Sequence, residues 1–223
     1  MKHLIALFIF FYPFTLSAQL NSVQLEAKPV PKPVIKDTMV SNWNARQVGY
    51  NTMSQQGKDF LYWTNYSRVN PKRFWDSVLV PVLKAFPNLQ SSYSQSLKAD
   101  LYNSPGLPVF KLNPTLIKTS QFHASDIGLK KAQPGHTSTD GKTFVDRVKG
   151  AGIIRCAGEN ISLGDVDPLM SLVLLYIDYG LPELGHRKTL LNATYVETGI
   201  GVSPYGDTGS TFIVEDFACT QDK

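Results

Sequence analysis

Histidine side chains are the first candidates for chemistry in this chain, because three of them lie in one stretch. These are His123, His136 and His186, and Glu159 lies among them in the sequence Gly-Glu-Asn. Imidazole titrates near neutral pH and is a common metal ligand, and a carboxylate can complete either kind of site. The pattern therefore predicts a metal site or an acid–base site, provided that the fold brings these residues together.

His136 and His186 have the surroundings of functional residues. His136 lies in the sequence Pro-Gly-His-Thr-Ser-Thr-Asp-Gly, a loop from which a side chain can point into a cleft, although a plain surface histidine is the alternative. His186 follows a long apolar segment and begins a helical turn, where the positive helix end favours the neutral imidazole that binds metals. A capping role is the alternative for His186.

Glu159 and His123 each have a structural alternative. Glu159 lies in an apolar, strand-like segment, and a buried carboxylate is costly unless it is paired or bound to a metal. It is either a functional acid or one half of a structural pair, with Arg155 or Arg187 as the candidate partner. His123 lies on the apolar face of a helix, so we interpret it as a buried, neutral histidine that hydrogen-bonds a loop.

The elements that must position these residues follow from hydrophobic patterning. The first half is predicted to be helical, with helices at 60–69, 72–83 with a kink at Pro81, and 93–102, and one that opens at Asn113 and carries His123. The second half alternates, with a helix at 143–149, a strand at 153–161, a buried helix at 169–179, and strands at 199–203 and 211–218. Helices that flank a small antiparallel sheet make an α+β domain.

The chain begins with a segment that has the composition of a secretory signal peptide. Residues 1–18 contain one early lysine, an apolar run and small residues at the end, which predicts cleavage before Gln19. A membrane anchor is the alternative, but the run is short and Pro13 interrupts it. No later stretch is long and apolar enough to span a bilayer, so we expect a secreted protein, periplasmic or extracellular.

Residues 19–44 are proline-rich and are expected to form an extended, solvated linker that contributes nothing to the core. Residues 45–223 are long enough for one domain with a sizeable core. The formal net charge of the whole chain is +4 and does not gather in a basic stripe, which excludes a nucleic-acid-binding protein.

The chain has two cysteines, Cys156 and Cys219. An even count in an exported protein favours a disulfide bond, and both cysteines lie in strand-like segments that can pair. Two buried free thiols are the alternative.

Several common catalytic motifs do not occur in the sequence. It contains no His-Glu-x-x-His of a zinc protease and no Gly-x-Ser-x-Gly of an α/β-hydrolase. What it contains is an ordered set of blocks that resembles the CAP superfamily of cysteine-rich secretory proteins, antigen 5, pathogenesis-related 1 proteins and bacterial SCP-like domains. The matching blocks include Asn65 and Arg68, 135–141, Asp146-Arg147, 157–161, 185–187, 199–202 and 217–218.

The resemblance implies a three-layer α-β-α sandwich with a small antiparallel sheet, the CAP fold, and a cleft that holds two histidines and two acids. By position, His136, His186 and Glu159 match metal ligands of the family, so Zn²⁺ or another divalent cation is the implied cofactor. Asp178 is the candidate for the second acid and Glu183 is the reserve, because the usual glutamate of the central helix is replaced here.

The implied function is that of a secreted binding or interaction module for a small apolar ligand, an envelope component or a protein. The alternative is a zinc-dependent hydrolase or protease, because two histidines and a carboxylate leave an open position on zinc. No further general base or nucleophile stands out in the sequence.

Overall fold

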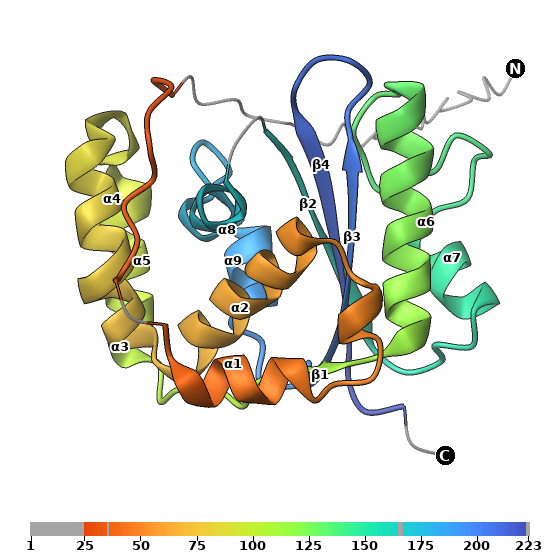
Figure 1. Cartoon of the computed structure of the whole chain (residues 1–223), viewed down its shortest axis with the longest axis horizontal. Coiled ribbons are helices and arrows are strands. Elements are labelled where there is room, and N and C mark those ends of the chain that lie inside the picture. The colour runs from red at the N-terminus through yellow and green to blue at the C-terminus, as the bar shows by residue number, and fades with distance from the viewer. Residues whose placement is uncertain (1–24, 35, 165–166, 222–223) are drawn as a thin grey trace, which may run out of the picture.

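A computed structural model describes residues 25–34, 36–164 and 167–221 of the chain. It has three layers, with a sheet in the middle and helices on both faces (Figure 1). The predicted signal peptide, 1–18, lies outside the described residues. No helix within the described ranges is long and apolar enough to cross a membrane.

The sheet has four strands in the order β1-β3-β4-β2, which are Lys111–Leu112, Glu197–Pro204, Thr211–Ala218 and Ala157–Gly164. The three long strands are antiparallel, as predicted, whereas the two-residue β1 pairs with β3 in parallel. The predicted strand at 153–161 begins only at Ala157, because Ile153 packs instead with Val148 of a neighbouring helix. Strand β2 forms one edge of the sheet, so one of its long sides is open to other elements.

One face of the sheet is covered by α6 (Pro114–Lys130) and the short α7 (Phe144–Gly150), which lie on the right in Figure 1. Helix α6 lies directly on β3 because two positions of the strand have no side chain. A Cβ atom at Gly199 would lie 2.1 Å from the backbone of Leu116, and one at Gly201 would lie 2.3 Å from that of Ser120. These glycines therefore set the spacing between the helix and the sheet.

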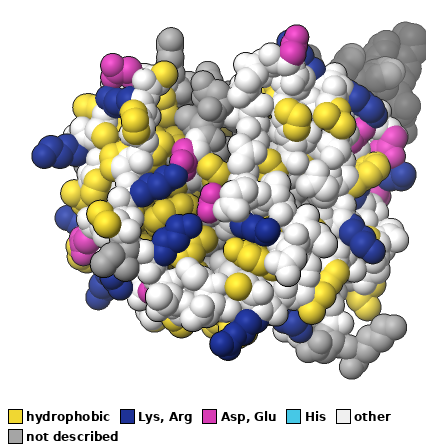
Figure 2. All heavy atoms as spheres, viewed as in Figure 1, with side chains coloured by type: hydrophobic (Ala, Val, Ile, Leu, Met, Phe, Trp, Pro, Cys, Tyr) yellow, Lys and Arg dark blue, Asp and Glu magenta, His cyan; other side chains and the backbone are white. Residues whose placement is uncertain are grey.

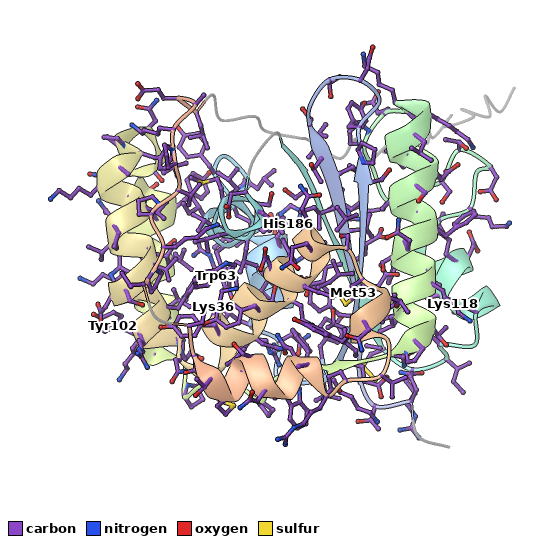
Figure 3. The ribbon with its side chains drawn as sticks, viewed as in Figure 1. Lys36, Met53, Trp63, Tyr102, Lys118 and His186 are labelled. Atoms are coloured by element: carbon purple, nitrogen blue, oxygen red, sulfur yellow. A yellow bond between two sulfur atoms is a disulfide. The ribbon has the colours of Figure 1, made fainter. Side chains whose placement is uncertain are left out.

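The other helices lie on the opposite face. They are α1 (Thr38–Ala45), α2 (Gln55–Val69), α3 (Pro71–Phe74), α4 (Val80–Ala85), α5 (Ser92–Asn103), α8 (Pro168–Ile177) and α9 (Gly185–Leu190), with a π-helical turn η2 (Trp75–Leu79) and 3-10 turns η1 (Tyr50–Thr52) and η3 (Pro87–Leu89). Trp63 of α2 and His186 of α9 lie on this side, whereas Lys118 projects from α6 on the other side (Figure 3). The apolar α8 packs against α2 in the centre of the core, which confirms the predicted buried helix.

The end of the proline-rich segment differs from the expectation. Residues 19–44 were expected to be a solvated linker, but α1 begins at Thr38 with Asp37 as its N-cap, and Val40 is fully buried. Asn44 accepts a 2.8 Å hydrogen bond from the side chain of Asn65 in α2. The linker prediction is therefore wrong for this end of the segment, because composition alone does not reveal that one short helix has a core to pack against.

Cys156 and Cys219 form a disulfide bond, with 5.6 Å between their Cα atoms. The bond ties the residue before β2 to the residue after β4, and these two strands are already antiparallel neighbours. The predicted pairing is confirmed.

On the face shown in Figure 2, the Lys and Arg side chains are scattered among apolar and neutral ones.

Candidate functional site

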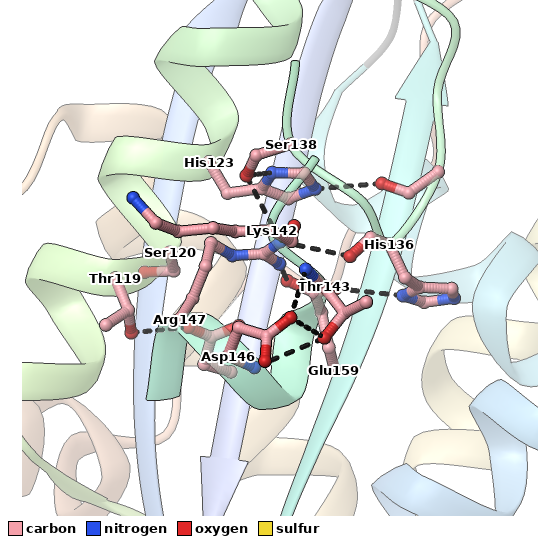
Figure 4. A network of polar contacts seen from close by, with 12 residues as sticks. Thr119, Ser120, His123, His136, Ser138, Lys142, Thr143, Asp146, Arg147 and Glu159 are labelled. Carbon is pink, nitrogen blue, oxygen red and sulfur yellow. Dashed lines mark hydrogen bonds and ion pairs between the residues drawn. The ribbon is translucent and has the colours of Figure 1, made fainter. Parts of the chain in front are cut away.

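His136 is held by a carboxylate that is itself paired with a buried arginine (Figure 4). Nδ1 of His136 lies 2.9 Å from Oε1 of Glu159, and Oε2 of Glu159 accepts a 2.5 Å hydrogen bond from Arg147 of α7. Burial would raise the pKa of Glu159, but the hydrogen bond to His136 and the charge of Arg147 outweigh it, so the pKa lies below the ordinary value. The partner of Glu159 is thus Arg147, and neither of the expected arginines, Arg155 or Arg187.

The loop that carries His136 is fixed by contacts along its length. Arg147 donates to the carbonyl oxygen of His136 and to the Ser138 hydroxyl, at 3.0 and 3.2 Å. His123 is fully buried in α6 and bonds the same loop at Ser138 and at the carbonyl of Gly135, which agrees with its structural interpretation. Burial lowers the pKa of His123, so this imidazole is neutral and can accept one hydrogen bond and donate the other.

His186 is held in the same way on the other side of the sheet. Nδ1 of His186 lies 2.5 Å from Oδ1 of Asp178, whose side chain is fully buried. Oδ2 of Asp178 accepts from the backbone N–H of Arg187 at 3.0 Å. Asp178 is the residue that ends α8, and its positive φ of 52° turns the chain back so that its carboxylate meets the start of α9.

A single cleft of about 330 Å³ lies between the two histidines. Of the residues expected at the site, His136, Glu159 and His186 line it, together with the reserve acid Glu183. Asp178 is not among the lining residues and lies behind His186. Asn160 also lines the cleft and donates a 3.2 Å hydrogen bond to the carbonyl oxygen of His186.

Two contributors to the site had no role assigned from the sequence, Arg147 and Asn160. Both lie in the sequence blocks noted above, Asp-Arg and Gly-Glu-Asn. Their roles depend on contacts between segments distant in the sequence, which the spacing of residues along the chain does not show. The alternation of side chains along a strand is the one signal that was available, since it places Glu159 and Asn160 on opposite faces.

Of the four histidine and acid side chains, the two imidazoles are the ones with a nitrogen left to contact a ligand. Each Nδ1 is engaged by an acid, which leaves Nε2 as the free nitrogen, and a carboxylate on the far nitrogen is the usual support of a metal-binding histidine. Both oxygens of Glu159 are engaged, so in this arrangement Glu159 orients His136. Across the described residues, no group of three His, Cys, Asp or Glu side chains is placed to hold a metal ion.

The chain is similar, at low identity, to several solved structures. An extracellular protein with an SCP domain from Bacillus anthracis is 24% identical, with a TM-score of 0.39 over 51% of this chain and 35% of that chain. An outer surface protein from Borrelia burgdorferi is 20% identical, with a TM-score of 0.43 over 58% and 90%. The venom allergen-like protein 4 of Schistosoma mansoni is 13% identical, with a TM-score of 0.45 over 76% and 92%.

The match covers only about a third of the Bacillus anthracis protein's length. Among curated proteins, none matches the chain. The family model described as CAP, the cysteine-rich secretory protein family, matches residues 65–217, which is well over half of the sequence. The matched range contains both histidines of the cleft and the acids that hold them. The chain therefore belongs to the CAP family of cysteine-rich secretory proteins.

Proposed function

We propose that this CAP protein is a ligand-binding module that works outside the cytoplasm, with the cleft between His136 and His186 as its binding site. The observation that carries the proposal is that each histidine is held at Nδ1 by a buried carboxylate, Glu159 or Asp178. Imidazoles anchored in this way present their remaining nitrogens in fixed positions, and fixed polar groups in a cleft are what small-ligand recognition requires.

The lining indicates the class of ligand. Pro134, Ile161 and Leu181 supply apolar surface around the two imidazoles, and the volume is near the lower end of the range for ligand sites. The ligand is therefore a small molecule, or the end of an envelope component or protein, that has an apolar body and one polar group. The polar group pairs with the imidazoles.

A divalent cation such as Zn²⁺ belongs to the proposal. Nε2 of His136 and Nε2 of His186 would hold it, while Glu159 and Asp178 keep both rings oriented. The cation would supply a Lewis acid that polarises the polar group of the ligand. Two imidazoles are fewer protein ligands than catalytic zinc sites usually have, which favours binding over hydrolysis.

A metal-assisted hydrolase is the second candidate, and the His136–Glu159 pair favours it. A histidine whose Nδ1 is bonded to a carboxylate is oriented to accept a proton at Nε2, as a general base does. In this candidate His136 takes a proton instead of holding the cation, which His186 would hold. Release of product from peptides and esters, in the presence of Zn²⁺, separates this candidate from a binding module. Turnover that disappears in His136→Ala would establish the hydrolase.

Calorimetric titration with Zn²⁺ tests the binding site directly. Zn²⁺ should bind to the unaltered protein, and the double variant His136→Ala with His186→Ala should not bind it. Asp207→Asn, at the exposed turn between β3 and β4, is the matched control and should bind as the unaltered protein does. Equal Zn²⁺ binding by the double variant, together with no small molecule retained in native mass spectrometry, would refute the proposed site.

The location outside the cytoplasm has its own test. A disulfide bond such as Cys156–Cys219 persists in oxidising compartments, which supports export. The intact mass of exported protein should correspond to a chain that starts at or near Gln19. Material that retains Met1 and remains in a membrane fraction would contradict export by a cleaved signal.

A further inference from the structure

Two buried polar side chains face each other under the cleft, from neighbouring strands. Asn160 of β2 and Glu215 of β4 are direct partners in the antiparallel register, so their side chains point to the same face of the sheet. Their exposed fractions are 1% and 0%, and α2 and α8 lie over this face. Directly opposed residues have Cβ atoms about 5 Å apart, which is within reach of a side-chain hydrogen bond.

Each of these two side chains has one oxygen without a hydrogen-bond partner among the described residues. These oxygens are Oδ1 of Asn160 and Oε2 of Glu215. The register brings these two side chains within reach of each other. Two acceptor oxygens turned toward each other in a buried site repel, and burial of either one without a hydrogen bond is costly. One proton on the glutamate converts this repulsion into a hydrogen bond, because a carboxylic acid donates where a carboxylate cannot.

The amide of Asn160 cannot resolve the conflict by turning over. Its Nδ2 donates to the carbonyl oxygen of His186 at 3.2 Å, so the reversed amide would place two oxygens against each other there. The orientation of Asn160 is thus fixed by the chain at His186, and Oδ1 must face elsewhere. Glu215, at the partner strand position, can supply a hydrogen to Oδ1 when its carboxyl group is protonated.

No cation pairs with Glu215 within the described part of the chain. The hydroxyl of Thr198 donates to Oε1 at 3.3 Å, and this is the hydrogen bond that the carboxyl group receives. The nearby charge is Arg68 of α2, but all of its guanidinium nitrogens donate to backbone carbonyls, those of Pro108, Leu190, Asn192 and Tyr195. A buried carboxylate without a paired cation is the situation in which the neutral acid is favoured.

We propose that Glu215 is a neutral carboxylic acid that donates a hydrogen bond from Oε2 to Oδ1 of Asn160 and thereby positions the His186 side of the cleft. In this arrangement Glu215 fixes the amide of Asn160. That amide donates to the carbonyl oxygen of His186, and Asp178 contacts the imidazole ring of the same histidine. Glu215 touches neither the cleft nor its ligand, so it acts as a positioning residue. The effect on ligand binding rests on the proposed function, whereas the protonation is measured without any ligand.

The electrostatic surroundings agree with the geometry. Burial raises the pKa of Glu215 to about 8, and the hydrogen bond from Thr198 and the charge of Arg68 only partly offset it. Tyr176 of α8 also faces this group, and burial raises its own pKa to about 12, so it stays neutral. The folded-state pKa of Glu215 is higher than the ordinary value of 4.5, so its contribution to stability is fully present below pH 4.5 and is lost as the pH rises through about 8.

The experiment compares the full chain with its Glu215→Gln variant, with Zn²⁺ absent. The glutamine amide can donate to Asn160 as the neutral acid does, but it does not titrate. The unfolding equilibrium constant of the unaltered protein is divided by that of Glu215→Gln at each pH. This ratio should rise by at most roughly tenfold per pH unit between about pH 5 and 8, and it should be constant at higher pH. Thr64→Val removes another unpartnered buried hydroxyl and is the matched control, which should keep the pH profile of the unaltered protein.

Carbon-13 NMR of the glutamate side chains gives a second readout that does not depend on the variants. The Glu215 carboxyl should titrate near pH 8, and the backbone amide of Arg187, next to His186, should show a step at the same midpoint that is lost in Glu215→Gln. A Glu215 carboxyl that titrates near pH 4.5, or an Arg187 step that persists in Glu215→Gln, would overturn the proposal. Neither result affects the outcome of the Zn²⁺ titration, which tests the proposed binding site separately.

Discussion

Glu159 and Asn160 are consecutive residues of β2, yet their side chains hold opposite walls of one cleft. Glu159 bonds His136 on the face covered by α6 and α7, and Asn160 bonds the backbone of His186 on the face covered by α2 and α8. The reason is that successive side chains of a strand point to opposite faces of the sheet. Because β2 is an edge strand, both walls can meet beside it, and the cleft lies along that edge.

Removal of the Glu159 charge should be costly because its partner is buried. Glu159→Gln leaves Arg147 without its carboxylate, and the loss of one partner of a buried pair costs about 3–5 kcal/mol. His136→Ala, at a half-exposed position, should cost less than about 1 kcal/mol. Urea denaturation of both variants at pH 7 measures the difference, and equal losses would contradict the buried pair as the main support of the loop.

The acid that supports Zn²⁺ binding by His186 should be Asp178 and not Glu183. Asp178→Asn weakens the support of the imidazole ring, so Zn²⁺ affinity should fall by about 10–100-fold. Glu183→Gln changes a carboxylate that lines the cleft, and calorimetry should show unchanged affinity. A larger loss in Glu183→Gln would assign the second acid to Glu183.

Asp126 should make the loop of His136 sensitive to acid. Its carboxylate accepts from the backbone and hydroxyl of Thr139 and from Lys130. Burial opposes ionisation, but these hydrogen bonds outweigh it and lower the pKa of Asp126 to about 2. The contribution of Asp126 to stability is therefore fully present above its ordinary pKa of 3.8 and is lost as the pH falls through about 2.

The matched variant for this effect is Asp126→Asn. It should be less stable than the unaltered protein at pH 7, by about 1–2 kcal/mol, and the gap should close towards pH 2. Denaturation midpoints measured across this pH range test the expectation. A gap that is independent of pH would mean that the carboxylate charge of Asp126 does not support the loop.

The close contact of α6 and β3 should not tolerate a methyl group. Gly201→Ala places a Cβ atom 2.3 Å from the backbone of Ser120, so the helix must move, at a cost of about 3 kcal/mol or more. Gly150→Ala is the control, since nothing lies within 4 Å of its Cβ position. Thermal unfolding should separate the two variants, and similar melting temperatures would show that α6 can shift freely on the sheet.

The disulfide bond should support the fold from the ends of β2 and β4. Its loss in Cys156→Ser with Cys219→Ser should cost about 2–4 kcal/mol, because the bond closes a long loop in the unfolded chain. Denaturation of the double variant, compared with the oxidised protein, measures the cost. A stability unchanged by both substitutions would contradict this estimate.

The sequence was sufficient to predict the class of fold, the three long strands and three residues that line the cleft, His136, Glu159 and His186. Local patterns were sufficient for this, as Asp167 and Pro168 begin the buried α8 and the β-branched and aromatic residues of β4 favour a strand. The loop of His136, with its glycines, was also recognisable because such loops place side chains at a surface. Each of these features depends on residues close together in the chain.

Which side chains are partners depends on the tertiary structure. Arg147 is the partner of Glu159, and Glu215 lies opposite Asn160, because strand register and helix packing bring together residues that are far apart in sequence. The same is true of Val40. Its helix, α1, follows a proline-rich stretch and was not predicted, because it is the core of the folded protein that buries Val40. Long-range pairing and burial depend on the whole folded chain, so they cannot be predicted from the residues next to each position.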